Sequence, residues 1–244
     1  MADPIQSCFA RCEKKYMLTP VRQQALLERI GPYLTPDAYP TYTICNLYYD
    51  TEDYRFIRAS LERPVYKEKL RVRSYGIPGE SSGVFVELKK KYDGIVYKRR
   101  VTMALTEVEP FLCGLLPPAQ FGQIGREIDW FQRCSRTVPK VFLAYDRTAF
   151  AGTDDPALRI TFDTGLRWRS SQLDLAAGDW GMRLLPEDKI LMELKLPGAC
   201  PLWLSRALSE LAIYPVSFSK YGECYTSCLL PAMQRTRRED IFCA

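Results

Sequence analysis

The alternation of apolar and polar residues along the chain predicts a run of β-strands. Side chains of a half-buried strand point to opposite faces in turn, so apolar residues recur at every second position. Runs of this kind, separated by polar or Gly-rich turns, occupy residues 9–17, 42–49, 65–75, 84–91, 95–103, 140–150, 157–163, 166–171 and 189–196.

Helical spacing of apolar residues is confined to fewer segments. It predicts helices over residues 21–33, 51–62, 105–136 and 202–213, and a last one after residue 221. The first of these follows Thr19-Pro20, a sequence typical of a helix start. Because no repeat or Pro/Gly/Ser-rich linker divides the chain, we expect a single domain over residues 1–244.

The polar faces of these strands are unusually basic. In the segment 65–75 the odd positions carry Lys67, Lys69, Arg71 and Arg73, and the even positions carry the apolar residues. The same separation places Lys89, Lys98, Arg100, Arg159, Lys195 and Lys15 on polar faces of other strands. A solvated face would mix neutral polar residues with both charges, and like charges on neighbouring strands destabilise a sheet. The pattern therefore favours a bound polyanion over simple exposure to water.

An apolar strand face must pack against something, and the helices 21–33, 105–136 and 202–213 are available. A sheet with apolar residues outside and basic residues inside is typical of a closed barrel with a polar lumen. We therefore predict an α+β fold, in which an antiparallel β tunnel barrel has a basic lumen and helices packed outside.

The same faces hold few carboxylates. Glu13, Glu87 and Glu193 are the candidate ligands for a divalent cation, Mn²⁺ or Mg²⁺, because such hard cations prefer oxygen. The chain has no Walker A motif and no GxGxxG, so side chains would have to hold phosphate groups. Arg binds phosphate through a planar fork and Lys acts as a point charge.

Composition narrows the possible chemistry. The chain has no His, which excludes Ser-His-Asp and Cys-His catalysis, His general bases and His-ligated zinc. The nine Cys lack a CxxC pair and favour reduced, mostly buried thiols. With no signal peptide and no long apolar segment, we expect a cytoplasmic protein without a membrane span. Trp and Tyr fall mostly where packing explains them, so nucleic acid is not an expected partner.

The ordered motifs resemble the VTC domain, the polyphosphate polymerase domain of the vacuolar transporter chaperone family, in a bacterial stand-alone form. The similarity covers residues 9–222 and depends on EKKY (13–16), YYDTED (48–53), KLRVRSYG (69–76), VFVELKK (84–90), YDRTAF (145–150), LRITFDT (158–164), LMELKL (191–196) and FSKYG (218–222). This family belongs to the triphosphate tunnel metalloenzymes, so the resemblance implies an antiparallel tunnel.

The resemblance also implies roles for individual residues. The matching phosphate-binding residues are Lys15, Arg71, Arg73, Lys89, Lys98, Arg147, Arg159 and Lys220. Among these we expect Arg71, Arg73, Arg147, Arg159 and Lys220 to serve catalysis, while Lys69, Arg100 and Lys195 extend the phosphate-binding set. Glu193 matches the metal-binding glutamate. The chain departs from the family near Ser60, where an arginine is usual, and at Ser217, often Lys in the eukaryotic type.

The reaction implied is transfer of the γ-phosphoryl group of ATP to a growing inorganic polyphosphate chain, with release of ADP. Two alternatives stay open on the sequence. The same tunnel could hydrolyse tripolyphosphate or a nucleoside triphosphate, for which Glu13 in Arg11-x-Glu13-x-Lys15 is the candidate base. It could also be a non-catalytic module that binds polyphosphate or an inositol phosphate.

Overall fold

One large antiparallel sheet organises the chain. A computed structural model describes residues 12–93 and 95–235. The strands are β1 (Cys12–Leu18), β2 (Leu34–Asp50), β3 (Tyr66–Tyr75), β4 (Gly83–Tyr92), β5 (Ile95–Ala104), β6 (Val138–Gly152), β7 (Arg159–Arg169), β8 (Met182–Arg183) and β9 (Ile190–Leu196). The helices are α1 (Pro20–Ile30), α2 (Arg55–Leu61), α3 (Leu105–Leu112), α4 (Gly122–Ser135), α5 (Leu202–Glu210) and α6 (Lys220–Cys224), the last continued by a π-helical turn, Tyr225–Leu229.

Most predicted elements are present, with revised limits. The predicted strand 9–17 starts in residues outside the described part, and β1 is described from Cys12. The predicted strands 157–163 and 166–171 are one strand, β7, because a register shift between Ala144 and Asp146 of β6 lets the pairing continue. The predicted helical block 105–136 divides into α3, a short 3₁₀ turn and α4. No helix of the described residues is long and apolar enough to cross a membrane.

The strand ladder corrects one part of the predicted fold. The strands pair in the order β1-β9-β7-β6-β2-β3-β4-β5, and in the described part of the chain β1 does not pair with β5. The closed barrel expected from the sequence is therefore absent from the hydrogen-bonding pattern. The free edge of β1 is partly occupied instead, since Val216 donates its backbone N–H to the carbonyl of Lys15 at 2.7 Å and Pro215 forms a bridge with Tyr16. Proline has no N–H to extend such a ladder.

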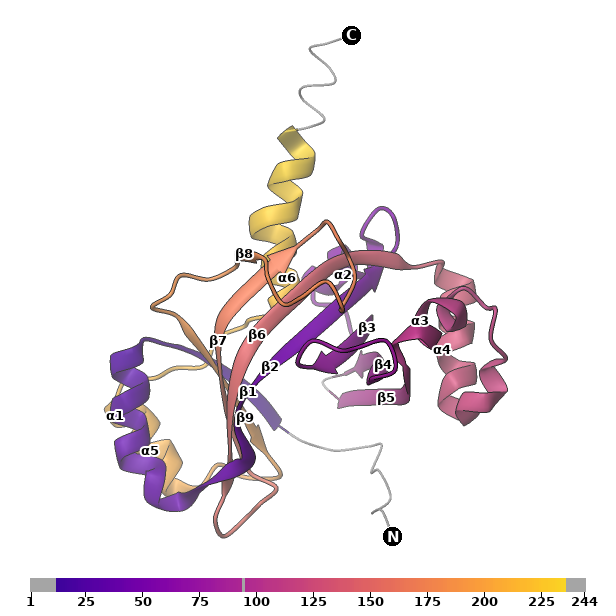
Figure 1. Cartoon of the computed structure of the whole chain (residues 1–244). Helices are drawn as coiled ribbons and strands as arrows, with labels where there is room; N and C mark the ends of the chain where they lie inside the picture. Colours follow the sequence, from indigo (N-terminus) through magenta and orange to yellow (C-terminus); the bar gives the residue numbers. More distant parts are fainter. Residues whose placement is uncertain (1–11, 94, 236–244) are drawn as a thin grey trace.

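Four helices cover the outer face of the sheet. Alpha helices α1 and α5 pack side by side on β1, β7 and β9, where Leu26 and Leu204 are fully buried (Figure 1). Helices α3 and α4 cover β2 to β6, where Phe111 and Ile128 are buried. Burial of these apolar faces is the main favourable term for the fold. The prediction of helices packed outside the sheet is confirmed.

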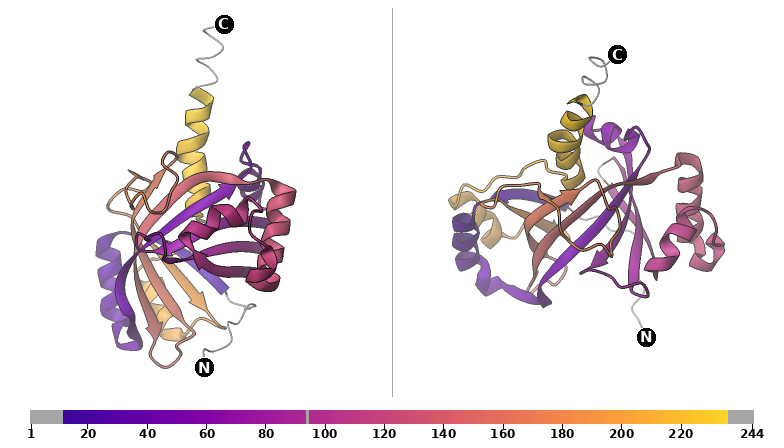
Figure 2. Two further views of the ribbon diagram at one scale, coloured as in Figure 1. Left: turned by 45° about the vertical axis from the view of Figure 1, so that its right-hand side comes forward. Right: turned by 45° about the horizontal axis from the view of Figure 1, so that its top comes forward.

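Helix α6 lies on the opposite, inner face. Tyr221, Cys224 and Tyr225 pack on Tyr48 of β2 and on β6 and β7, and the helix then projects beyond the sheet (Figure 2). Its first turn is capped by the Ser219 hydroxyl, which accepts a hydrogen bond from the N–H of Gly222. The inner face thus carries the basic residues and α6, and Ile57 of α2 is buried in the same cluster as Tyr221.

Candidate functional site

Register places the predicted basic side chains on adjacent strands. Lys69 of β3 lies opposite Lys89 of β4, which lies opposite Lys98 of β5. The next row toward the end of these strands pairs Lys67 with Lys91. Such like-charge pairs cost free energy in an empty sheet. We name the five residues Lys67, Lys69, Lys89, Lys91 and Lys98 the lysine ladder.

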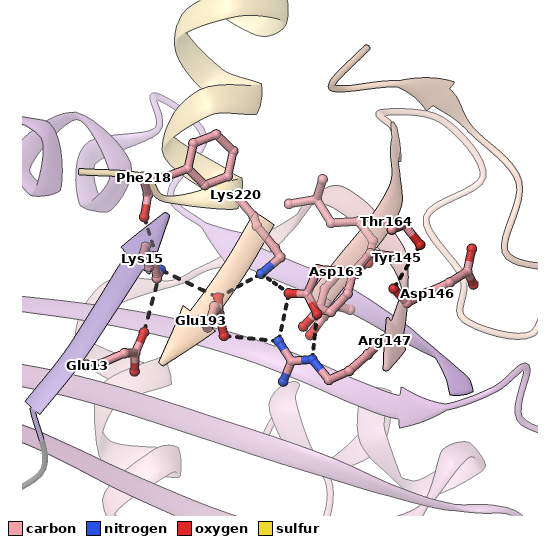
Figure 3. A network of polar contacts seen from close by, with 12 residues as sticks. Glu13, Lys15, Tyr145, Asp146, Arg147, Asp163, Thr164, Glu193, Phe218 and Lys220 are labelled. Atoms are coloured by element: carbon pink, nitrogen blue, oxygen red, sulfur yellow. Dashed lines mark hydrogen bonds and ion pairs between the residues drawn. The ribbon is translucent and has the colours of Figure 1, made fainter. Parts of the chain in front are cut away.

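Elsewhere on the inner face, cations and carboxylates form a buried network (Figure 3). Arg147 of β6 binds Asp163 of β7 through two hydrogen bonds, of 2.6 and 2.7 Å, and donates a third to Glu193 of β9 at 3.0 Å. The ammonium group of Lys220 lies 2.6 Å from Asp163 and 2.9 Å from Glu193. We call these four residues the carboxylate cluster.

Strand β1 brings two further predicted residues to this cluster. The Lys15 ammonium lies 3.7 Å from Glu193 and 3.6 Å from Glu13, and donates a hydrogen bond to the carbonyl of Phe218 at 3.0 Å. Residues 203 positions apart thus meet at one point. The register between β1 and β9, with Lys15 opposite Glu193, explains the contact between these two side chains.

Charge complementarity fixes the protonation states in the carboxylate cluster. Burial alone would raise the pKa of Glu193, but Lys220, Arg147 and Lys15 hold that pKa well below its usual range. Burial would lower the pKa of Lys220, yet Glu193 and Asp163 raise it above the ordinary value. Glu193 and Lys220 are therefore both charged near neutral pH.

A second ion group surrounds Glu87 on β4. Arg71 donates to this carboxylate at 2.8 Å, while Lys98 and Arg100 lie 3.4 and 3.8 Å from its other oxygen, Oε1. Burial opposes ionisation of Glu87, but Arg71 and Arg73 hold its pKa far below the usual value. Oε1 is buried and accepts no hydrogen bond from the described residues.

Three neutral residues that the sequence did not single out position the arginines. Arg71 donates to the hydroxyl of Tyr48 at 3.2 Å. Arg73 donates to the side-chain oxygen of Asn46 at 2.8 Å and to the hydroxyl of Tyr145 at 3.3 Å. Period-two alternation around 42–49 and 140–150 could have placed these residues on the inner face, but their neutral side chains carried no charge signal.

The lysines without close carboxylates behave differently. Burial, with repulsion from Lys89 and Lys67, lowers the pKa of Lys69 to about 8. Burial also lowers the pKa of Lys195 to about 8, with Arg147 and Lys89 adding to the effect. The pKa of Lys89 is lowered by burial and by Arg71. These depressed values mark positive charge that a bound anion would stabilise.

Arg159 stands at the margin of this arrangement. It lies opposite Lys195 in the sheet and forms an ion pair with Asp37 of β2. Its side chain is 37% exposed, whereas that of Arg147 is 8% exposed. All of the predicted basic site residues lie on the inner face, but Arg159 is the more accessible of these two arginines.

The carboxylates fit a divalent cation only as a pair. Glu13 and Glu193 approach the same ammonium group from either side, and Mg²⁺ sites commonly combine one or two carboxylates with phosphate oxygens of the substrate. Burial would raise the pKa of Glu13, but Lys89 and Lys15 lower it, so this carboxylate is ionised and able to bind a cation. Glu87 belongs to the other ion group, and the described residues contain no cluster of three acidic, Cys or His side chains suited to a metal.

Solved structures identify the fold. A crystal structure of a candidate adenylate cyclase from Bacillus halodurans is similar with a TM-score of 0.55, at 13% identity over 88% of this chain and 96% of that one. HpAC1 from Hippeastrum, described as a candidate adenylyl cyclase with a dominant triphosphatase activity, is similar with a TM-score of 0.50. Its identity is 16% over 88% of this chain and 94% of that one. No curated protein matches the sequence.

An antiparallel sheet with ionised basic residues on its inner face defines the class: the chain has the triphosphate tunnel fold, whose members are phosphate-handling enzymes that generally use divalent metals. The sequence identifies the family more narrowly than the fold does. Residues 10–229 match the VTC domain, so the chain belongs to the VTC domain family.

Proposed function

We propose that this chain is a polyphosphate polymerase, which transfers the γ-phosphoryl group of ATP to the end of an inorganic polyphosphate chain and releases ADP. The proposal combines the family membership with one structural observation, the lysine ladder. Its substrates would be ATP and polyphosphate, and it would require Mn²⁺ or Mg²⁺.

The ladder extends the basic face beyond what a triphosphate needs. From Arg73 to Lys67, alternate residues of β3 are cationic over six positions, about 20 Å at the usual rise of a strand. A triphosphate group is much shorter than this track. The two outer rows, around Lys69 and Lys67, place lysines opposite lysines, an arrangement that a longer polyanion would relieve.

In phosphoryl transfer the protein contributes mainly positioning and charge stabilisation. Arg71, Arg73, Arg147 and Arg159 would hold phosphate oxygens, and the carboxylates that now bind the first and third keep their guanidinium groups ordered without substrate. Lys220 would add positive charge beside Glu193. A divalent cation, when held by Glu193 and Glu13, would neutralise charge on the nucleotide phosphates.

Hydrolysis is the second candidate, because HpAC1 shares the fold and is described as a triphosphatase. It would need a base to activate water, and Glu13 is the candidate. A general base works best when its pKa lies near the working pH. Lys89 and Lys15 lower the pKa of Glu13, which weakens this carboxylate as a base.

The test is a time course with the purified protein, ATP and Mn²⁺, in which ADP, free phosphate and long anionic product on a gel are measured together. The polymerase yields ADP and polymer with little free phosphate. Free phosphate without polymer would establish the hydrolase instead. If neither forms while added polyphosphate raises Tm, the protein is a binding module.

Glu193→Gln sharpens the result. We expect a loss of turnover of about 100-fold or more with polyphosphate binding largely retained, because a metal ligand contributes at least as much as its supporting residues. Glu187→Gln is the control, since Glu187 is 74% exposed and pairs with Arg183 on the surface. Full activity of Glu193→Gln would refute the metal assignment.

A further inference from the structure

Three aromatic side chains stand at the end of the basic face opposite the lysine ladder. The rings of Tyr42 and Tyr75 meet edge to face with centroids 5.7 Å apart, and Tyr75 meets Phe85 in the same way at 5.7 Å. They come from three consecutive strands of the sheet, β2, β3 and β4. We name Tyr42, Tyr75 and Phe85 the aromatic group.

Core packing accounts for this group only in part, since Tyr42 packs against the buried cluster of Ile44 and Tyr145. Tyr75 is 53% exposed, although its strand neighbours Ser74 and Arg73 are buried. Tyr42 and Phe85 are half-buried, so each keeps part of its side chain open to solvent. An exposed aromatic ring held in place by two others offers a rigid apolar surface at little entropic cost.

Cations border the same surface. The guanidinium carbon of Arg100 lies 4.4 Å from the centre of the Phe85 ring. Arg73 precedes Tyr75 by two positions on the same face of β3, a distance of about 7 Å along a strand. Arg147 lies opposite Tyr42 in the sheet. An occupant would therefore combine a flat apolar part with an adjoining anionic part.

We propose that the aromatic group binds the nucleobase of a nucleoside triphosphate by stacking, while the phosphates extend from Arg73 toward the lysine ladder. The inference rests on the proposed function for the direction of the phosphate chain. It adds a base subsite at one end of the basic face and assigns that end to the nucleotide. The other end is then left for polyphosphate.

The experiment compares two ligands that share a triphosphate and differ in the base. Binding of ATP and of inorganic tripolyphosphate, each with Mg²⁺, is measured by calorimetry on the full chain. We expect Tyr75→Ala to weaken ATP binding about tenfold and to leave tripolyphosphate binding unchanged. Tyr75→Phe, which keeps the ring, should bind ATP as the unaltered protein does.

Tyr92→Ala is the matched control. The exposed fraction of Tyr92, 55%, is close to the 53% of Tyr75. However, Tyr92 lies at the far end of β4, on the other face of the sheet. This variant should bind both ligands normally. Equal effects of Tyr75→Ala on both ligands, or no effect on either, would overturn the base subsite.

The outcome is separable from that of the polymerase proposal. Selective loss of ATP binding in Tyr75→Ala supports the subsite even if no polymer is formed by the unaltered protein. Conversely, polymer formation with unchanged ATP binding in Tyr75→Ala would leave the polymerase standing and remove the subsite. Failure of the unaltered protein to bind ATP at all would overturn the subsite as well.

Discussion

The carboxylate cluster and the lysine ladder lie on one face of the same sheet but differ in how their charges are balanced. In the cluster, two buried carboxylates balance Arg147 and Lys220 at contact distance. In the ladder, lysines face lysines across three strands, and burial lowers the pKa of Lys69 to about 8. The charges of the first region are balanced within the protein, whereas the like charges of the second would be relieved by a bound anion. The comparison teaches that a basic face can contain both its framework and its binding surface.

The largest expected effect comes from breaking the framework. Asp163→Asn removes the charge that Arg147 and Lys220 share, and losing one partner of a buried ion pair typically costs about 3–5 kcal/mol. We expect a fall of that size in the free energy of unfolding, measured by urea titration. Asp37→Asn is the control: its partner Arg159 is 37% exposed, so the loss should be about 1 kcal/mol or less. Equal losses would contradict the distinction between the two regions.

Removing a charge from the lysine ladder should instead raise the stability of the unliganded protein. Lys69→Met keeps the length of the side chain and removes a charge that faces Lys89. We expect the unliganded protein to gain up to about 1 kcal/mol of stability, since like charges opposite each other destabilise a sheet. Polyphosphate binding should weaken and become less dependent on salt, because fewer ions are released. A variant that loses stability and binds polyphosphate normally would show that Lys69 is structural.

The smallest expected effect is that stability and polyphosphate affinity change in opposite directions as the pH rises. The pKa of Lys69 and Lys195 is about 8 in the folded chain, below the ordinary value of a lysine, 10.5. Between pH 8 and about 10.5 the unfolded chain therefore holds more protons at these sites, and their contribution to stability rises with pH. A bound polyanion favours the charged lysines, so affinity for polyphosphate should fall over the same range.

Urea titration and polyphosphate binding at pH 7.5 and 9.5 would measure both trends. The variant carrying Lys69→Met and Lys195→Met serves as the reference, since other groups also titrate. If the pKa values of Lys69 and Lys195 lie near the ordinary value of a lysine, the unaltered protein and the reference variant should show the same changes in stability and in affinity between the two pH values.

The basic inner face could be predicted because a strand alternates its faces strictly. Once 65–75 was recognised as a strand, Lys69, Arg71 and Arg73 had to share one face. Register was not predictable in the same way. Asp163 lies in the predicted strand 157–163, but only the pairing of β6 with β7 brings it to Arg147. Neutral partners such as Asn46 and Tyr48 carried no charge pattern and were missed for that reason.

The segment that pairs with the edge of β1 also could not be predicted from the local sequence pattern. Pro215 and Val216 looked like a loop between helices, yet they take part of the β1 edge that a closed barrel would have used. The last helix was predicted, but not its place on the inner face, because helical spacing shows which side is apolar and not what that side packs against. Both outcomes depend on contacts between segments far apart in the chain.

Those contacts also bear on how the molecule is assembled. Lys15 meets Phe218 across 203 positions, and Tyr221 donates a hydrogen bond to Asp50 across 171. During synthesis, all of the described strands are made before Lys220 is added, so the carboxylates at 163 and 193 precede one of their two principal cations. Contacts of such separation slow folding and lengthen the time that intermediates persist. One cation of the site is thus supplied by a segment that follows all of the described strands in the sequence.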